Sequence, residues 1–303
     1  MAHVSSPARR AATAAALACA TLAACGGQDV VVEQAPTPRE RGVAPAAGGT
    51  TAADPLRAGT HAASTLQITV DDTDPGRFAY RAPRVVRGGL VEIRLRNVGD
   101  APHKAQLWRI AGDHSVAQAL KISHPQPGWQ RAAGGVSLTA PKTTSTTLQA
   151  LPAGRYYVAG TLDQPGRVAT FRVTGPAAAP EPPKAPARVQ ALDFSFRVSG
   201  LHAGRNSVDF DNTGTQPHHA FFAPMRPDAN LADVRKFFGE RTSVGRPPVG
   251  DATRETVVLE GGERQVTQLN LSAGRYALIC FVRSRGGGPR HLELGMINEV
   301  TVR

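Results

Sequence analysis

Leu271-Ser-Ala-Gly-Arg-Tyr276 lies near the end of the chain, and a near copy, Leu151-Pro-Ala-Gly-Arg-Tyr156, lies in the middle. Upstream of each copy, a segment of alternating apolar and polar residues leads into a second shared motif. That motif reads Asn97-Val-Gly-Asp-Ala-Pro-His103 in the first block and Asn212-Thr-Gly-Thr-Gln-Pro-His218 in the second. Alternation with a period of two is typical of half-buried strands. Because order and spacing agree at both places, the chain is predicted to contain two copies of one domain.

The composition favours an all-β protein. The sequence has 303 residues, with 31 glycines, 24 prolines and few aromatics, and no segment shows long helical periodicity. Many short strands separated by turn residues predict two tandem Greek-key β-sandwiches with short helical insertions. We place these domains at residues 65–174 and 187–303. Between them, residues 175–186 are rich in proline and predict a semi-rigid, extended linker.

Each copy carries a helical insertion between its matched strands. In the second copy, residues 230–239 place Leu231, Val234 and Phe238 on one helical face, with Asp228 or Asn230 as the N-cap and a glycine as the stop. Residues 113–121 of the first copy are a shorter version. The apolar positions of both insertions are predicted to pack against the sandwich.

The N-terminus has the features of an export signal, residues 1–24. Arg9 and Arg10 precede a small apolar stretch that is too short to span a bilayer. The stretch ends in Leu22-Ala-Ala-Cys25, which resembles a bacterial lipobox, with cleavage before Cys25 and a diacylglyceryl group on its sulfur. The motif that ends at Cys19 fits less well. An ordinary secretory signal with a nearby cysteine is the alternative.

Residues 25–64 contain mainly alanine, proline, glycine and threonine, and predict a disordered tether. The expected location is therefore the cell envelope, outside the cytoplasm, with the protein anchored to the membrane by its lipid. The formal net charge is +11, but the arginines are scattered, which makes nucleic-acid binding a poor interpretation. A basic surface could face anionic lipid or an acidic protein, or it could be an ordinary solvated surface.

The third cysteine has no partner in the mature chain. Cys19 would leave with the signal and Cys25 would be acylated, so Cys280 would stand alone in a compartment that permits disulfides. Such a thiol is buried and inert, paired between molecules, or bound to a metal. The residues that follow favour the metal, because His291 and Met296 come after Cys280 in the last part of the chain. Thiolate, imidazole and thioether are ligands that copper selects.

A copper site that transfers electrons needs two imidazoles and a thiolate, with a weak axial thioether. The chain offers these groups in the order His218, Cys280, His291, Met296. Each residue alone has an ordinary explanation. A buried cysteine commonly acts as a small hydrophobic residue, a methionine fills a core, and a histidine lies on the surface.

The second copy resembles the cupredoxin family, the plastocyanin- and azurin-like blue copper proteins. The motif that ends in His218 is similar to the strand with the family's upstream histidine, and the region from Gly274 to Met296 resembles its C-terminal ligand loop. The resemblance implies one copper ion in the C-terminal domain. His218 and His291 would be equatorial ligands, Cys280 the thiolate and Met296 the axial ligand.

One departure concerns the loop between Cys280 and His291. Ten residues, 281–290, separate them, whereas the family's loops are much shorter. Gly286 and the two glycines after it could let the loop fold back, or the loop could leave the site open to water. A second ambiguity is His218 against His219, which point to opposite faces of a strand. The repeat selects His218, and His219 is expected to face solvent or the other domain.

The first copy is predicted to bind no metal. It keeps His103, but Gly160 stands where the second copy has Cys280, and no second histidine and methionine follow. This copy would act as a spacer, a lid or a docking surface. The other histidines show no ligand spacing and receive no role: His61, His114, His124 and His202.

Together these features predict one-electron transfer with a redox protein partner, without a small-molecule substrate and without enzymatic turnover. No nucleophile with its base and no acid–base pair can be recognised in the sequence. Copper storage or delivery is an alternative, although the methionine-rich clusters of many copper carriers are lacking. A metal-free module that binds an envelope partner is a third interpretation, since a fold can persist without its site.

Overall fold

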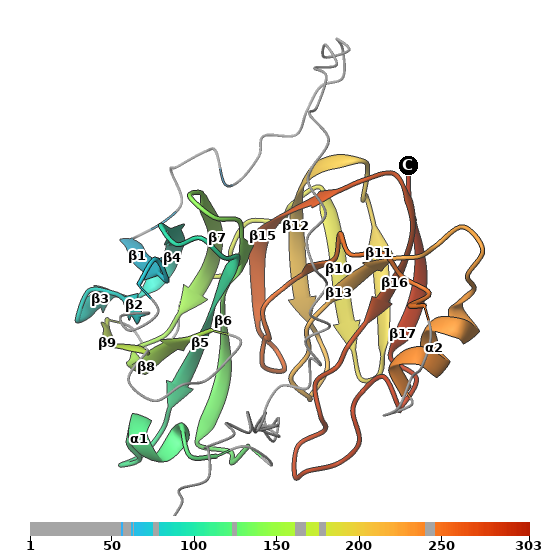
Figure 1. Ribbon diagram of the computed structural model, residues 1–303. Coiled ribbons are helices and arrows are strands. Elements are labelled where there is room, and N and C mark those ends of the chain that lie inside the picture. The colour runs from blue at the N-terminus through green and yellow to red at the C-terminus, as the bar shows by residue number, and fades with distance from the viewer. Residues whose placement is uncertain are drawn as a thin grey trace, which may run out of the picture.

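The computed structural model describes residues 56, 62, 64–74, 79–122, 126–160, 168–175, 180–239 and 246–303 (Figure 1). The predicted signal peptide, Cys25, His61, His124 and most of the predicted tether lie outside the described residues. The first strand begins at Ser64, and Leu56 and Ala62 pack against an apolar cluster on the sheet. The described part of the chain is almost entirely β-sheet, which confirms the predicted fold class.

Within the described residues, the first half forms nine strands and one short helix. These are β1 Ser64–Asp71, β2 Ala79–Arg81, β3 Val85–Arg87, β4 Gly89–Asn97, β5 His103–Ile110, α1 Val116–Ala119, β6 Gln130–Thr139, β7 Thr144–Leu151, β8 Gly154–Ala159 and β9 Ala169–Thr174. β3, β9, β8, β5 and β6 form one sheet, and β7, β4, β1 and β2 lie in the other. Apolar residues from the two sheets alternate inward and form a common core, which includes Ile68, Ile93, Leu107 and Val158.

The second half, as far as the structure describes it, repeats this arrangement with eight strands and one helix. These are β10 Ala187–Leu192, β11 Ser195–Ser199, β12 Gly204–Asn212, β13 Phe221–Pro224, α2 Leu231–Gly239, β14 Arg254–Glu255, β15 Arg264–Leu271, β16 Gly274–Ile279 and β17 Ile297–Val302. β14, β13, β16 and β17 form one sheet, opposite β11, β10, β12 and β15. Val208, Phe210, Phe222 and Leu278 belong to the core between them.

The strands of the two halves pair in the same order, which confirms a repeated β-sandwich. β1 runs parallel to β4, as β10 runs parallel to β12. β4 pairs with β7 as β12 pairs with β15, and β5, β8 and β9 pair as β13, β16 and β17 do. In both copies the matched tyrosine donates a hydrogen bond to the carbonyl four residues before it, Tyr156 to Pro152 and Tyr276 to Ser272. The domain bounds remain predictions.

The two halves share one sheet, which the sequence did not predict. Edge strands β7 and β15 pair through Gln149 with Gln265 and Leu148 with Val266, and join eight strands into one sheet across the molecule (Figure 1). Part of the predicted linker also packs on this sheet, because Ala185 contacts the apolar cluster that contains Val266. Pairing removes two open sheet edges.

Both predicted helical insertions are present. α2 is capped by Asn230, whose side-chain oxygen accepts from the backbone N–H groups of Ala232 and Asp233. Val234 is buried, and Leu231 and Phe238 pack against the same apolar cluster. The helix therefore lies on the sandwich with the predicted face inward. α1 has a capping box of Ser115 and Gln118 and is shorter than the predicted segment.

Candidate metal centre

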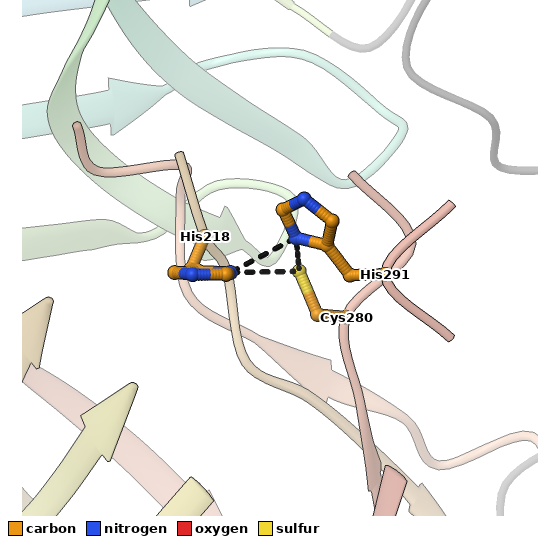
Figure 2. Close-up of side chains that lie close together, drawn as sticks. All are labelled: His218, Cys280 and His291. Atoms are coloured by element: carbon orange, nitrogen blue, oxygen red, sulfur yellow. Dashed lines mark hydrogen bonds between the residues drawn. The ribbon is translucent and has the colours of Figure 1, made fainter. Parts of the chain in front are cut away.

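Three side chains from distant parts of the second half meet at one point (Figure 2). His218 Nδ1 lies 2.9 Å from His291 Nδ1, and the Cys280 sulfur lies 3.7 Å and 3.5 Å from these two atoms. All three side chains are buried, and their potential ligand atoms lie within 4.8 Å of one another. This group is the one cluster of potential metal ligands found among the described residues.

His218 is held by the turn that the repeated motif encodes. The side chain of Asn212 donates to the carbonyls of Gln216 and Leu259 and accepts from the N–H of Gly214. Asn97 makes the corresponding bonds in the first copy. A Cβ on Gly214 would lie 2.3 Å from an Asp193 carboxylate oxygen, so this close approach requires glycine. The motif thus fixes the backbone just before His218.

Asp193 orients the His218 ring. Its carboxylate accepts hydrogen bonds from the backbone of Thr215 and Gln216 and lies 2.9 Å from His218 Nε2. Burial alone would raise the pKa of Asp193, but the hydrogen bonds from Thr215 and His218 outweigh burial and hold this pKa well below its ordinary value. The ionised carboxylate places the ring proton of His218 on Nε2. Nδ1 therefore presents its lone pair to the cluster.

Cys280 and His291 meet because the long loop between them folds back on itself. Gly286 and Gly287 adopt left-handed φ values of 78° and 88°, and Ser284 N–H donates to the Pro289 carbonyl across the turn. Beyond this hairpin, His291 N–H donates to Val282 and Leu292 N–H donates to the Cys280 carbonyl. Of the two alternatives that the sequence left open, the structure has the loop folded back, and the ten-residue spacing does not separate the two ligands.

Phe194 covers the imidazoles, and sequence reasoning missed it. Its ring lies edge-on to His291 at a centroid distance of 5.0 Å and to His218 at 6.5 Å. Its φ of 121° is unusual for a residue with a side chain and costs about 1–3 kcal/mol. The strained turn between β10 and β11 thus supplies both Asp193 and the aromatic cover. The signal in the sequence concerns Asp193 alone, which corresponds to Asp72 of the first copy, because Phe194 corresponds to a residue of another kind, Thr73.

Met296 belongs to the same apolar cluster as Cys280 and is fully buried. Its N–H donates to the His291 carbonyl, and its own carbonyl accepts from Cys280 N–H at 3.2 Å. The backbone of Met296 therefore connects Cys280 to His291. Its role as the axial ligand remains a prediction.

The cluster is neutral when no metal is bound. Burial raises the pKa of the Cys280 thiol to about 12 and lowers the pKa of His291 to about 3. Burial also lowers the pKa of His218, although Asp193 opposes this. At neutral pH both imidazoles can offer lone pairs, and a metal ion that binds must displace the thiol proton.

The residues fit a bound cation. If both rings carry their proton on Nε2, two lone pairs face each other at 2.9 Å, and the contact is repulsive unless a positive charge lies between them. His291 Nε2 is buried without a hydrogen-bond partner in the described part of the chain. Placing the proton on His291 Nδ1 instead lets it donate to His218 Nδ1 at 2.9 Å but still leaves Nε2 buried without a hydrogen-bond partner in the described part of the chain, so neither tautomer satisfies the whole ring. A cation shared by the two Nδ1 atoms and the thiolate removes the repulsion. Two imidazoles and one thiolate are a donor set that suits copper.

The structure selects His218 over His219, as the repeat predicted. His219 points the other way: its Nδ1 lies 3.9 Å from Glu255 of β14, whose carboxylate pairs with Lys104 of the first half. Its Nε2 accepts a hydrogen bond from Phe281 N–H at 3.0 Å. It is buried and does not face solvent.

The first copy has no corresponding cluster within the described residues. His103 keeps its carboxylate partner, Asp72, at 2.9 Å. However, a Cβ on Gly160 would lie 2.6 Å from the Tyr80 hydroxyl oxygen. Tyr80 therefore occupies the space next to the position where the second copy has its thiol. His114 stacks on Trp129 in the first half, and His202 lies exposed, so neither reaches the metal centre.

The chain is similar to several solved structures, but it matches no known sequence family. No family model and no curated protein matches the chain. A reduced auracyanin from Roseiflexus castenholzii is 18% identical and covers 38% of this chain and 94% of its own, with a TM-score of 0.27. Auracyanin B is 24% identical over 38% of this chain and 86% of its own, with a TM-score of 0.26. A multicopper oxidase is 16% identical over 79% of this chain and 88% of its own, with a TM-score of 0.23.

One expectation from the sequence is corrected by these comparisons. We expected a protein that is not an enzyme. The similar structures include proteins named as enzymes: the multicopper oxidase, a blue copper oxidase from Nitrosomonas europaea, a copper-containing nitrite reductase from Thermus scotoductus and a laccase from B. aclada, at 12–16% identity. The expectation was wrong, because it took the lack of a recognisable acid–base pair or nucleophile to exclude catalysis, and copper enzymes need neither.

The matched pair of aspartates gives a test of the His218 geometry. Asp193→Asn is expected to weaken copper binding about 10- to 100-fold, because the amide no longer fixes the ring tautomer. Asp72→Asn should leave copper binding unchanged. Both variants lose a carboxylate acceptor in the same turn, so each should lower the free energy of unfolding by about 2 kcal/mol. Competition with a copper chelator and urea unfolding measure the two effects, and an equal loss of copper affinity in both variants would contradict the assignment.

Proposed function

We propose that this chain binds one copper ion through His218, Cys280 and His291, with Met296 as the axial ligand, and transfers single electrons. The observation that carries the proposal is the convergence of two imidazole Nδ1 atoms and a thiol in one buried cluster. When bound, copper supplies a one-electron couple between Cu(I) and Cu(II).

The protein's own residues would keep that couple easily reversible. Asp193 fixes the ring of His218, the loop hairpin fixes His291, and the backbone of Met296 bridges Cys280 and His291. Phe194 covers both rings and helps to keep water away from them. A preorganised, dry set of ligands changes little between two oxidation states, which suits fast electron transfer.

The proposed setting is the outer face of a membrane. Residues 1–24 would direct export, and a lipid on Cys25 would anchor the protein through the segment that follows. No helix in the described residues is long and apolar enough to cross a membrane. A redox protein is the proposed partner, and the net charge of +11, or about +9 once Arg9 and Arg10 leave with the signal, would favour an acidic one. Loss of the protein from the membrane fraction in Cys25→Ala would support the anchor, and unchanged membrane association would contradict it.

Titration of the purified protein with Cu(II) tests the proposed function. We expect uptake of one equivalent, an intense visible thiolate-to-copper charge-transfer band, and reversible bleaching of that band by one electron. No stoichiometric uptake would overturn the proposal. Tight binding of Cu(I) without a reversible redox wave would instead indicate copper storage or delivery, because the same buried soft donors also suit Cu(I).

A further inference from the structure

The first half, which has no metal ligands, contacts a segment of the second half that pairs with the backbone of His218. This segment is residues 255–259. Gly134 N–H in β6 donates to the Val258 carbonyl at 3.1 Å, and Ala133 forms a bridge with Leu259. Leu259 in turn exchanges two backbone hydrogen bonds with His218, each 2.9 Å long. A continuous backbone ladder thus runs from β6 of the first half to His218.

The side chain of Gln106 in β5 reinforces this ladder. Its Nε2 donates to the Val258 carbonyl at 3.0 Å, and its Oε1 accepts from the Val258 N–H at 2.8 Å. The same Nε2 also donates to the Gly134 carbonyl at 3.1 Å. The glutamine amide therefore replaces a neighbouring strand for Val258, in a buried position where an unpaired backbone group would be costly.

A second connection runs through charged groups to the residue after the thiol. Lys104 Nζ in β5 lies 2.9 Å from Glu255, and both side chains are largely buried. The other carboxylate oxygen of Glu255 lies 3.9 Å from His219 Nδ1. His219 Nε2 accepts from Phe281 N–H at 3.0 Å, directly after Cys280 in the chain. The connection therefore begins in the first half and ends next to the thiol.

We infer that the first half is a positioning part of the metal centre, with Gln106 and Lys104 as positioning residues that act through residues 255–259 and His219. One connection reaches His218 and the other reaches the peptide after Cys280. Their combined effect is to fix the separation of two ligands from different segments, His218 before β13 and Cys280 directly after β16. This inference rests on the proposed function for its effect on copper. Its structural part concerns the protein without metal.

Two variants and a matched control test the inference in the full chain. Gln106→Leu removes the three amide hydrogen bonds that reach Val258 and Gly134. Lys104→Met combined with Glu255→Gln removes the ion pair without leaving an unpaired charge. Gln130→Leu is the control: it makes the same change at a buried glutamine of the first half, whose side chain donates to Tyr157 of that same half.

Amide hydrogen exchange of the metal-free proteins is the first measurement. We expect faster exchange at Leu259 and His218 in Gln106→Leu, and at Phe281 in Lys104→Met/Glu255→Gln, with no change at these amides in Gln130→Leu. In copper-loaded protein, both test variants should keep one equivalent of metal but bind it about 10-fold more weakly, with a shifted charge-transfer band.

Unchanged exchange at these three amides in both test variants would overturn the inference. So would the same increase in the control, because it would indicate general loosening of the first half. If Gln106→Leu does not fold, the charge-pair variant decides. If the wild-type protein takes up no copper, the proposed function fails, and the exchange data still decide whether the first half positions His218 and Phe281.

Discussion

Cys280→Ser is expected to abolish the thiolate-to-copper charge-transfer band and most of the stability that copper gives the protein. Cys280 is the free cysteine of the described residues, and its sulfur lies within 3.7 Å of both imidazole Nδ1 atoms. A serine hydroxyl is a hard, neutral donor that cannot give this band and binds soft copper poorly. Because the two imidazoles would remain, we expect the variant to bind copper weakly and without the charge-transfer band.

The size of the effect on stability follows from mass action. At a free copper concentration 1,000 times the dissociation constant, binding to the folded state alone adds about 4 kcal/mol to the free energy of unfolding. For a protein of this size, each kcal/mol moves the unfolding midpoint by about 2–4 °C. The wild-type protein should therefore unfold about 8–16 °C higher with copper than without it, as measured by calorimetry. The shift in Cys280→Ser should be much smaller.

The metal-free form of the variant serves as its control. Because serine is close in size to cysteine, metal-free Cys280→Ser should still unfold in one cooperative transition, which shows that the fold is retained. A charge-transfer band that survives the substitution would have to come from another thiol of the chain, Cys19 or Cys25. That result would contradict the assignment of Cys280 as the ligand.

The repeat in the sequence predicted most of the fold. The repeated residues have steric and hydrogen-bonding roles, and these roles can be recognised from the sequence alone. Asn97 and Asn212 bind the same two carbonyl positions, and the paired tyrosines close the same corner in each copy. The shared sheet was not predictable in this way. Pairing of β7 with β15 involves only two residue pairs, and nothing in either strand marks it as an inner strand of a larger sheet.

The site was predicted to the extent that its ligands are rare residue types. His218, Cys280 and His291 were chosen for their chemistry and order, and the structure brings these three together. Asp193 and Phe194 were missed because an aspartate and a phenylalanine in a turn carry no such signal. Only the backbone conformation, with a φ of 121° at Phe194, distinguishes the turn from any other.

Comparison of the two copies separates scaffold from metal centre. The carboxylate–imidazole pair occurs in both copies, at 2.9 Å in each, although the first copy has no thiol beside it. The Asp193–His218 contact is therefore part of the fold and is not by itself evidence for a metal. Cys280, His291 and Phe194 occur in the second copy alone. These three residues, and not the pair, distinguish a copper site from a structural histidine.

The metal-free protein is expected to depend on pH through two buried imidazoles. Burial lowers the pKa of His291 to about 3 and that of His219 to about 4, so both remain neutral in the folded protein at pH 5. In the unfolded chain each takes up a proton below a pKa of about 6.5. The unfolded state then binds more protons, so the free energy of unfolding falls as the pH falls below about 6.5.

The expected size is about 1.4 kcal/mol per group for each pH unit below 6.5, or about 4 kcal/mol for both groups at pH 5. Glu263 acts in the opposite direction, because burial and the neighbouring Glu260 raise its pKa to about 7. The contribution of Glu263 cancels when the wild-type protein is compared with a variant that keeps Glu263. Between pH 7 and pH 5, the wild-type protein should lose about 4 kcal/mol more than His219→Gln/His291→Gln, measured by urea unfolding with a chelator present.

His202→Gln is the matched control for this experiment, because it makes the same substitution at an exposed histidine of the same half. Its stability should follow the wild-type curve throughout. If the double variant also follows that curve, the two imidazoles are protonated in the folded protein at pH 5. Their lone pairs would then not be free at that pH, and the cluster would not be the neutral, preorganised ligand set on which copper binding depends.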